Sequence, residues 1–237
     1  MTNALRLSLI SLLLILNFTP SVSLANDAIY QRLLDRIGQQ LGTSSEIAEK
    51  FLIEVDTMAI TIQNNFEKVA SHKTPQFKKD NLVQETIARF FVNRNAIVQT
   101  TSLSRQVSQT ETVGDYLTRL AGMSRKYYTT VKLLFDKKYF SLGDIEEYYE
   151  NGKKKFDFSV AMWQIFIGCK DANSECYSDA TKKVFHMVFK YDNNVAAWDF
   201  KVKAITAELK QTMRLEDYKQ MRCRWAPEEC EGASSDF

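Results

Sequence analysis

The sequence predicts an α+β domain in which helices come first and long antiparallel strands follow. In the first part of the chain, apolar residues recur at steps of three and four residues. From Ala96 onward they alternate with polar residues instead. The alternating segments are joined by short polar turns, which suits antiparallel pairing. This order of elements is typical of the α+β class, with helices packed over a curved, mainly antiparallel sheet.

Three helices are predicted in the first part of the chain, before the spacing of the apolar residues changes. The first lies within 26–44, where Asp27 caps it and Gly42 stops it. The second carries an apolar stripe that is too broad for a coiled-coil seam, so we expect it to lie across a core. The stripe consists of Ile47, Phe51, Val55, Met58, Ile62, Phe66 and Val69. The third helix opens at Pro75, where the missing N–H costs nothing.

The strands follow with one short helix among them. We expect an edge strand over 96–107 and then a helix that Thr112 caps. A strand is expected over 131–135. The segment 156–167 is apolar on one face along its length and on both faces near its end, so we expect a central strand that is covered on both sides there. The strand over 184–191 pairs with it.

The last strand shows the clearest alternation. Its predicted core face holds Ala196, Trp198, Phe200, Val202 and Ala204, and its predicted solvent face holds Asp199, Lys201 and Lys203. The run Lys153–Lys155 follows Asn151-Gly152, which predicts the tip of a hairpin in solvent rather than a binding patch.

Four cysteines form two pairs with equal spacing: Cys169 and Cys176, then Cys223 and Cys230. Three disulfide connectivities are open, and we favour the two local ones because 170–175 has the composition of a turn. A short loop of this kind stabilises by about 2–3 kcal/mol in the chain-entropy model. The alternative is a four-cysteine metal site, but zinc ligands usually lie closer together in sequence.

Residues 1–25 have the pattern of a secretory signal peptide. A basic start precedes an apolar run from Leu7 to Phe18, and small residues stand before a cleavage point ahead of Asn26. The run is too short to span a bilayer. We therefore expect an exported protein, periplasmic, at the cell surface or secreted, with no transmembrane segment in the mature chain. An uncleaved anchor is the alternative.

The predicted organisation has four parts: a signal peptide over 1–25, a helix over 26–44, an α+β domain over 45–210, and a tail with a disulfide loop over 211–237. Without the first part, the chain retains about 212 residues and a net charge near +1. That length suffices for one well-filled core. Because basic and acidic residues are nearly equal in number, the chain does not supply the positive field that nucleic acid binding needs.

The element order over 45–209, and the segments 163–168 and 177–182 in particular, resemble a known family. Trp163-Gln164-Ile165-Phe166-Ile167-Gly168 followed by Tyr177-Ser178-Asp179-Ala180-Thr181-Lys182 is similar to a strand-loop-strand pattern of exported nuclear-transport-factor-like proteins from Bacteroidota. The resemblance implies a cone in which helices close over a curved sheet. That family includes dehydratases, isomerases, ligand-binding proteins and interaction modules, so it does not decide function.

Five residues are candidates for binding a ligand in such a cone: Tyr116, Trp163, Gln164, His186 and Trp198. His186 is either a general base or a strand histidine bonded to a neighbour. Gln164, in an apolar setting, either orients a ligand or makes a structural bond to the backbone or to Tyr116. The aromatic rings suit the wall of an apolar pocket or an ordinary core.

No residue is assigned a catalytic, metal or cofactor role, because the chain has no G-x-S-x-G, no glycine-rich phosphate loop and no metal-ligand spacing around its two histidines. Our first hypothesis is a non-enzymatic exported module that binds a protein partner or its own copy, or helps to assemble the envelope. The second is a protein that binds a small apolar molecule or lipid fragment, or a hydro-lyase or isomerase. A cone filled by side chains would favour the first.

Overall fold

The computed structural model describes residues 24–104, 107–170, 176–192 and 197–225. The predicted signal peptide lies almost wholly outside these residues. The chain divides into two compact units, one up to Lys50 and one from Phe51 onward. The boundary between them falls within helix α3 (Ser45–Ala70).

The first unit contains helix α2 (Leu24–Leu41) and the start of α3. Helix α2 ends at Gly42, whose φ of +62° lies in the left-handed region that glycine adopts without strain. The amide of Thr43 then donates to the carbonyl of Gly38 at 2.8 Å. The predicted stop of this helix is therefore confirmed.

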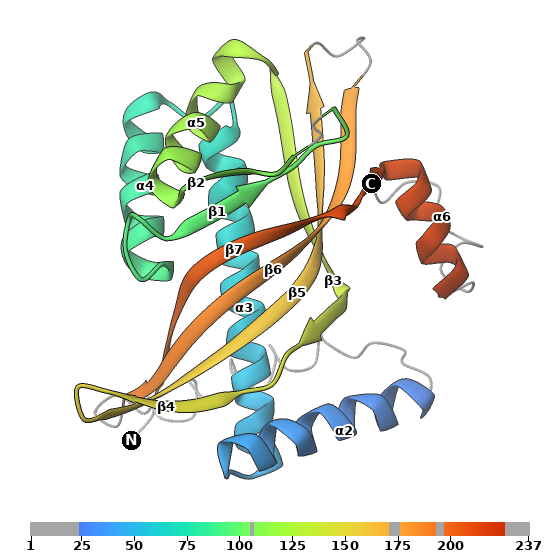
Figure 1. The fold of residues 1–237 in the computed structure, drawn as a ribbon. Coiled ribbons are helices and arrows are strands. Elements are labelled where there is room, and N and C mark those ends of the chain that lie inside the picture. Colours follow the sequence, from blue (N-terminus) through green and yellow to red (C-terminus); the bar gives the residue numbers. More distant parts are fainter. Residues whose placement is uncertain (1–23, 105–106, 171–175, 193–196, 226–237) are drawn as a thin grey trace, which may run out of the picture. The chain divides into compact units, whose positions relative to one another are not determined.

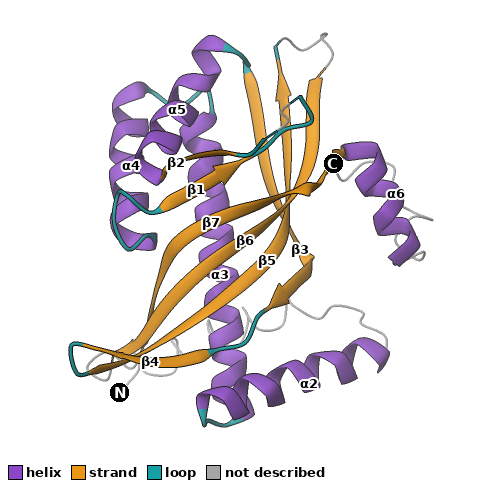
Figure 2. Ribbon diagram, viewed as in Figure 1, coloured by secondary structure: helices purple, strands orange, loops and turns teal. Residues whose placement is uncertain are grey.

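The second unit is built on one seven-stranded sheet, with the order β2-β1-β7-β6-β5-β3 and β4 beside the first half of β5 (Figures 1 and 2). The strands are β1 (Ile97–Thr100), β2 (Gln109–Thr112), β3 (Thr130–Leu142), β4 (Glu146–Glu150), β5 (Lys153–Cys169), β6 (Cys176–Asp192) and β7 (Ala197–Arg214). Pairing is antiparallel except between β1 and β7.

Helices cover one face of this sheet, which we call the inner face. Strands β5, β6 and β7 curve around α3 (Figure 1), and the ring of Phe51 on α3 packs on Phe158 and Phe189. Helices α4 (Gln76–Phe90) and α5 (Val113–Lys126) complete this layer. The predicted α+β class, with helices over a curved and mainly antiparallel sheet, is confirmed.

The predicted cap of α5 is also confirmed. The hydroxyl of Thr112 accepts a hydrogen bond from the amide of Asp115 at 3.1 Å, which satisfies one of the free N–H groups at the start of the helix.

The opposite face of the sheet, the outer face, carries helix α6 (Leu215–Trp225). Tyr218 of α6 is fully buried in a small cluster with Trp163 and Ile165. Its hydroxyl donates to Asp136 Oδ2 at 2.7 Å, and Arg222 Nε lies 3.3 Å from the same oxygen. The prediction that the end of β5 is covered on both sides is therefore confirmed.

The register of β7 corrects one prediction. Ala204 was expected on the core face, but His186 pairs with Ala204 while the next residue, Met187, pairs with Val202. Lys203 is therefore the extra residue of a β-bulge, which reverses the alternation beyond it. Ile205 is buried in place of Ala204.

Two further strands differ from the prediction. The edge strand expected over 96–107 is only β1, and β1 lies between β7 and the true edge strand β2. Strand β4 was not predicted at all. The hairpin from β4 to β5 does turn at Asn151-Gly152, where φ values of 53° and 71° match the tight turn that this dipeptide favours.

Strand β3 forms the other edge of the sheet, and α3 covers part of that edge. The amide of Leu133 donates to Glu67 Oε1 at 3.1 Å, and the amide of Phe135 donates to Gln63 Oε1 at 2.6 Å. The distance between residues i and i+2 of a strand is close to the distance between residues i and i+4 of a helix. Both bonds can therefore form along one side of α3. Helix side chains thus take hydrogen bonds that an edge strand would otherwise offer to another chain.

Candidate functional site within the cone

One half of the inner face is filled by aromatic rings. Phe189 is 2% exposed and lies at the centre of this aromatic cluster. Its ring centroid is 4.8–5.3 Å from those of five neighbours: Phe51, Phe156, Phe158, Trp198 and Phe200. Rings at these distances pack as a core rather than as the wall of an open pocket.

The other half of the inner face encloses a small cavity. Its volume is about 10 Å³, and it is lined by Phe66, Val98, Thr100, Tyr116, Phe135, Gln164, Lys183, Phe185 and Ile205. Such a volume holds about one water molecule, whereas pockets for small ligands measure about 300–1,000 Å³. This cavity is therefore too small for an organic ligand in the conformation described.

Two of the predicted site residues meet at this cavity. Tyr116, on α5, hydrogen-bonds the side chain of Gln164 on β5, so the predicted structural bond of Gln164 to Tyr116 is present. Burial raises the pKa of Tyr116 to about 12. The guanidinium of Arg119 lies over the Tyr116 ring at 5.5 Å and pairs with Glu111. Tyr116 is therefore a neutral hydrogen-bonding group at neutral pH.

Strand β6 adds a row of buried polar side chains that the sequence analysis missed. Asp179, Thr181 and Lys183 alternate along its inner face, and each is at most 5% exposed. Lys183 reaches the cavity, where its Nζ donates to the carbonyl of Gln99 at 2.7 Å. Burying ionisable groups costs free energy, so such a row is a candidate functional feature as well as a structural one.

The disulfide could have revealed this row. Cys169 pairs with Cys176 across the hairpin, which fixes the register of β5 against β6. In that register, Lys183 of β6 lies opposite Met162 of β5, which is on the apolar face predicted for β5. Polar residues opposite a core face are the signal that local alternation alone did not show.

Tyr177 extends the polar row at the end nearest the disulfide hairpin. Its hydroxyl donates to Asp179 Oδ2 at 2.5 Å and accepts from the amide of Leu103 at 3.1 Å. Burial, and then the bond to the Asp179 carboxylate, raise the pKa of Tyr177 to about 12. The tyrosine thus ties the segment after β1 to β6.

The other three predicted site residues lie elsewhere. Trp163 faces the outer side of the sheet and packs on Tyr218 at 5.0 Å. His186 is also on the outer face, with Nε2 3.0 Å from Thr206 Oγ1. Trp198 belongs to the aromatic cluster. The five residues therefore do not surround one cavity, and a ligand-binding role for them stays a prediction.

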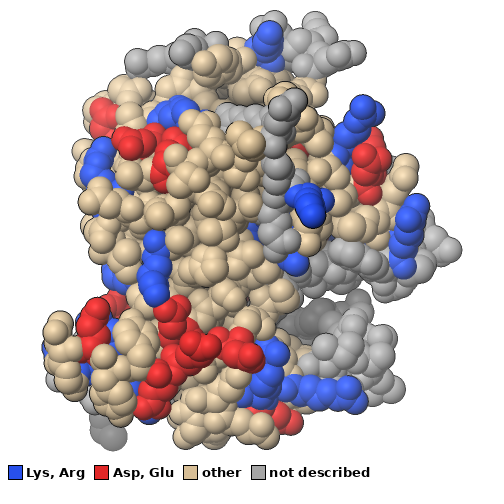
Figure 3. Space-filling view, viewed as in Figure 1, with Lys and Arg blue, Asp and Glu red and all other residues tan. Residues whose placement is uncertain are grey.

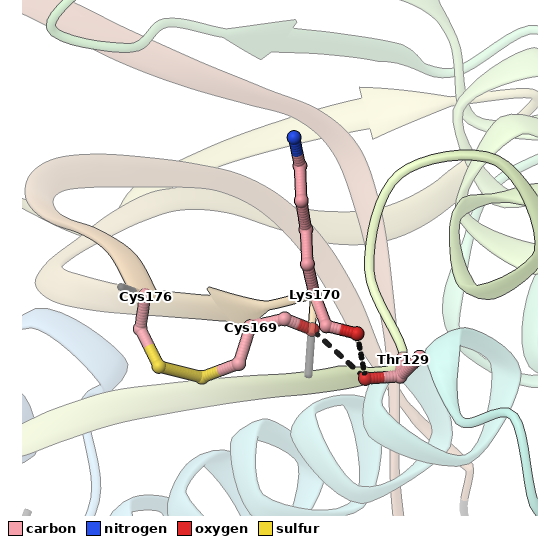
Figure 4. Close-up of a disulfide and its surroundings, with 4 residues drawn as sticks. All are labelled: Thr129, Cys169, Lys170 and Cys176. Carbon is pink, nitrogen blue, oxygen red and sulfur yellow. Dashed lines mark hydrogen bonds between the residues drawn. A yellow bond between two sulfur atoms is a disulfide. The ribbon is translucent and has the colours of Figure 1, made fainter. Parts of the chain in front are cut away.

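The predicted disulfide between Cys169 and Cys176 is present and closes the hairpin between β5 and β6 (Figure 4). Thr129 braces the same point, because its hydroxyl donates to the carbonyls of Cys169 at 3.1 Å and Lys170 at 2.5 Å. Cys223 is disulfide-bonded, and Cys230 lies outside the described residues.

The described residues contain neither a cluster of metal ligands nor a membrane-spanning helix. No three His, Cys, Asp or Glu side chains in these ranges are grouped closely enough to hold a metal ion. In the same part of the chain, no helix is long and apolar enough to cross a membrane.

Comparison with known proteins gives a likeness of fold alone. No protein-family model and no curated protein matches the chain. Two solved structures from Novosphingobium aromaticivorans are similar. One, described as the beta subunit of an aromatic-ring-hydroxylating dioxygenase, is 11% identical with a TM-score of 0.37, over 68% of this chain and 90% of that chain. The other, described as a scytalone dehydratase, is 12% identical with a TM-score of 0.33, over 70% and 90% respectively.

Proposed function

We propose that this protein is an exported, non-enzymatic binding module that acts through protein–protein contacts in the cell envelope or outside the cell. The observation that carries the proposal is the filled inner face. The aromatic cluster occupies one half, and the cavity in the other half has a volume of only about 10 Å³. Binding through the outside of the fold needs no internal space.

Two features support export. Residues 1–25 have the composition of a signal peptide, and the chain carries a disulfide between Cys169 and Cys176. Disulfides of this structural kind persist mainly in oxidising compartments. Together they favour a periplasmic, cell-surface or secreted protein.

Native mass spectrometry of the protein purified gently from its own envelope fraction tests the proposal. We expect the chain to be found with a protein partner or as a defined oligomer, and without a bound small molecule. A small mass that co-purifies and is lost on denaturation would overturn the proposal. The same sample gives the intact mass, and a mass that starts near Asn26 supports cleavage of the signal peptide.

A second candidate function is binding or conversion of a small molecule in the cone. The observation that favours it is the buried polar row Asp179, Thr181 and Lys183, which meets Tyr116 and Gln164 at the cavity. Such a site would have to open before an organic ligand could enter. The polar groups would then orient a ligand that carries an acceptor for Lys183.

Thermal-shift screening against small aromatic and carboxylate compounds tests this second candidate. A compound that raises the melting temperature of the wild-type protein but not of Lys183→Met would support it. The variant Lys201→Met is the matched control, because Lys201 donates to the carbonyls at the end of α4, away from the cavity. Equal shifts in all three proteins would count against the cone.

A further inference from the structure

One corner of the second unit carries exposed basic and aromatic side chains together. It lies where α3 ends at Ala70 and α4 begins at Gln76. From Lys68 to Lys79 the chain has four lysines and no acidic residue. We call the exposed side chains of this segment, together with the one that follows α5, the basic corner. It consists of Lys68, His72, Lys73, Phe77, Lys78 and Tyr127.

The end of α5 lies beside the start of α4 at this corner. Lys79 of α4 is buried, and its Nζ donates to the carbonyl of Ala121 on α5 at 3.0 Å. The first turn of α4 therefore packs against the second half of α5. Helix α4 runs away from the corner while α5 runs toward it (Figure 1). Tyr127, which directly follows α5, thus lies at the same end of the second unit as Phe77.

Both aromatic side chains of the basic corner are exposed, Phe77 by 64% and Tyr127 by 52%. The position of Phe77 on its helix explains its exposure. Phe77 precedes the buried Lys79 by two positions, which is about 200° around a helix. Its ring therefore points away from the buried side of α4, which consists of Lys79, Val83, Thr86, Ile87 and Phe90.

The lysines of the basic corner have no acidic partner in the part of the chain that the structure describes. Elsewhere on the surface, Lys154 and Lys203 each pair with a carboxylate. The two acidic residues that flank the segment make other bonds. Glu67 accepts from an amide of β3, and Asp80 accepts from the Gln76 side chain at 2.8 Å. The corner therefore presents positive charge that no ion pair neutralises.

We infer that the basic corner binds the surface of an anionic lipid bilayer. Single exposed apolar residues are common on proteins, but two aromatic rings beside unpaired lysines form the combination that peripheral proteins present to such a surface. The lysines meet the lipid phosphates, and the rings lie among the headgroups, where aromatic side chains are favoured. A nucleic acid needs a longer positive track than one corner provides. The inference goes beyond the proposed function, which concerns protein partners.

The number of lysines sets the expected strength. Each lysine near an anionic leaflet strengthens binding by about fivefold, so Lys68, Lys73 and Lys78 together give about a hundredfold preference for anionic over neutral lipid. This preference falls as added salt shortens the distance over which the charges act. We therefore expect a reversible association that is sensitive to salt.

Cosedimentation with lipid vesicles tests the inference, using the protein purified from its own envelope fraction. We expect binding to vesicles of phosphatidylglycerol and phosphatidylcholine in equal parts, and at least about tenfold weaker binding to phosphatidylcholine alone. The neutral vesicles also report any binding through residues 1–25. The double variant Lys73→Gln, Lys78→Gln should bind anionic vesicles at least about tenfold more weakly than the wild type.

Lys153→Gln with Lys210→Gln is the matched control for the change in charge. Both lysines are exposed, on β5 and β7, and neither is paired, so this variant should bind as the wild type does within about twofold. Phe77→Ala should weaken binding by about tenfold, because it removes the ring that lies among the headgroups. Circular dichroism establishes that each variant is folded.

A wild-type protein that does not bind anionic vesicles would overturn the inference. Equal binding to the two kinds of vesicle would do the same, as would equal weakening by the two double-lysine variants. A protein partner that is lost in the Lys73→Gln, Lys78→Gln variant, with no binding to vesicles, would replace the lipid surface by an acidic protein and leave the proposed function standing.

Discussion

Truncating Phe189 to alanine measures how tightly the inner face is packed. The ring is 2% exposed and is surrounded by five other rings, with centroids 4.8–5.3 Å away. The nearest, Phe156, is stacked on it with an interplanar angle of 11°. The substitution therefore removes the centre of the aromatic cluster and leaves a cavity lined by ring edges.

The expected cost is large. Replacing a buried Phe by Ala costs about 3–5 kcal/mol, and aromatic pairs contribute about 0.5–1.5 kcal/mol each beyond the area that they bury. These contributions do not add fully for neighbours in contact, so we expect a loss near the upper end, about 5 kcal/mol. For a protein of this size, that loss corresponds to a fall in melting temperature of about 10–20 °C.

Urea unfolding followed by tryptophan fluorescence measures the loss, because the Trp198 ring lies 5.3 Å from Phe189 and reports on the same cluster. Phe77→Ala is the control. Phe77 is 64% exposed, so its truncation should change the unfolding free energy by less than about 0.5 kcal/mol. A loss of less than about 2 kcal/mol for Phe189→Ala, with an unchanged denaturant dependence, would contradict close packing and favour an open cone.

Three other perturbations have defined outcomes. Replacing Cys169 and Cys176 by Ser should lower stability by about 2–3 kcal/mol without abolishing the fold; an unchanged melting curve would show that the bridge contributes nothing. The pKa of Tyr116 is raised to about 12 from its usual 10.0. Its contribution to stability is thus complete below pH 10 and lost as pH rises through about 12, so Tyr116→Phe should flatten the alkaline fall in urea-measured stability. Tyr218→Phe removes the 2.7 Å bond to Asp136 and should cost about 1–2 kcal/mol, with faster amide exchange in α6; protected α6 amides in that variant would argue against this role.

The features that the sequence predicted correctly depend on residues close together in the chain. The stop of α2 at Gly42 and the cap of α5 by Thr112 are each decided within one helical turn. The disulfide of Cys169 joins strands that one short hairpin connects. Local propensity and spacing were sufficient in these cases because no distant segment could alter the outcome.

The features that the sequence did not predict depend on pairing between strands. The bulge at Lys203 reverses the faces of β7, yet the chain around it alternates without a break. The polar row that contains Asp179 and Lys183 faces inward only because of the register of β6 on β5. The bond from Gln164 to Tyr116 was foreseen because an amide in an apolar setting needs a partner, whichever strand provides its surroundings.

The hydrogen bonds from β3 to α3 also limit how copies of this protein can join through strand edges. A ribbon of sheets that grows without limit needs two accepting edges on every copy, since each must pair on both sides. Glu67 and Gln63 already occupy the β3 edge at Leu133 and Phe135. Edge pairing at this part of β3 is therefore blocked by two side chains of one helix, and a second copy would have to pair at another edge of the sheet, such as β2 or β4.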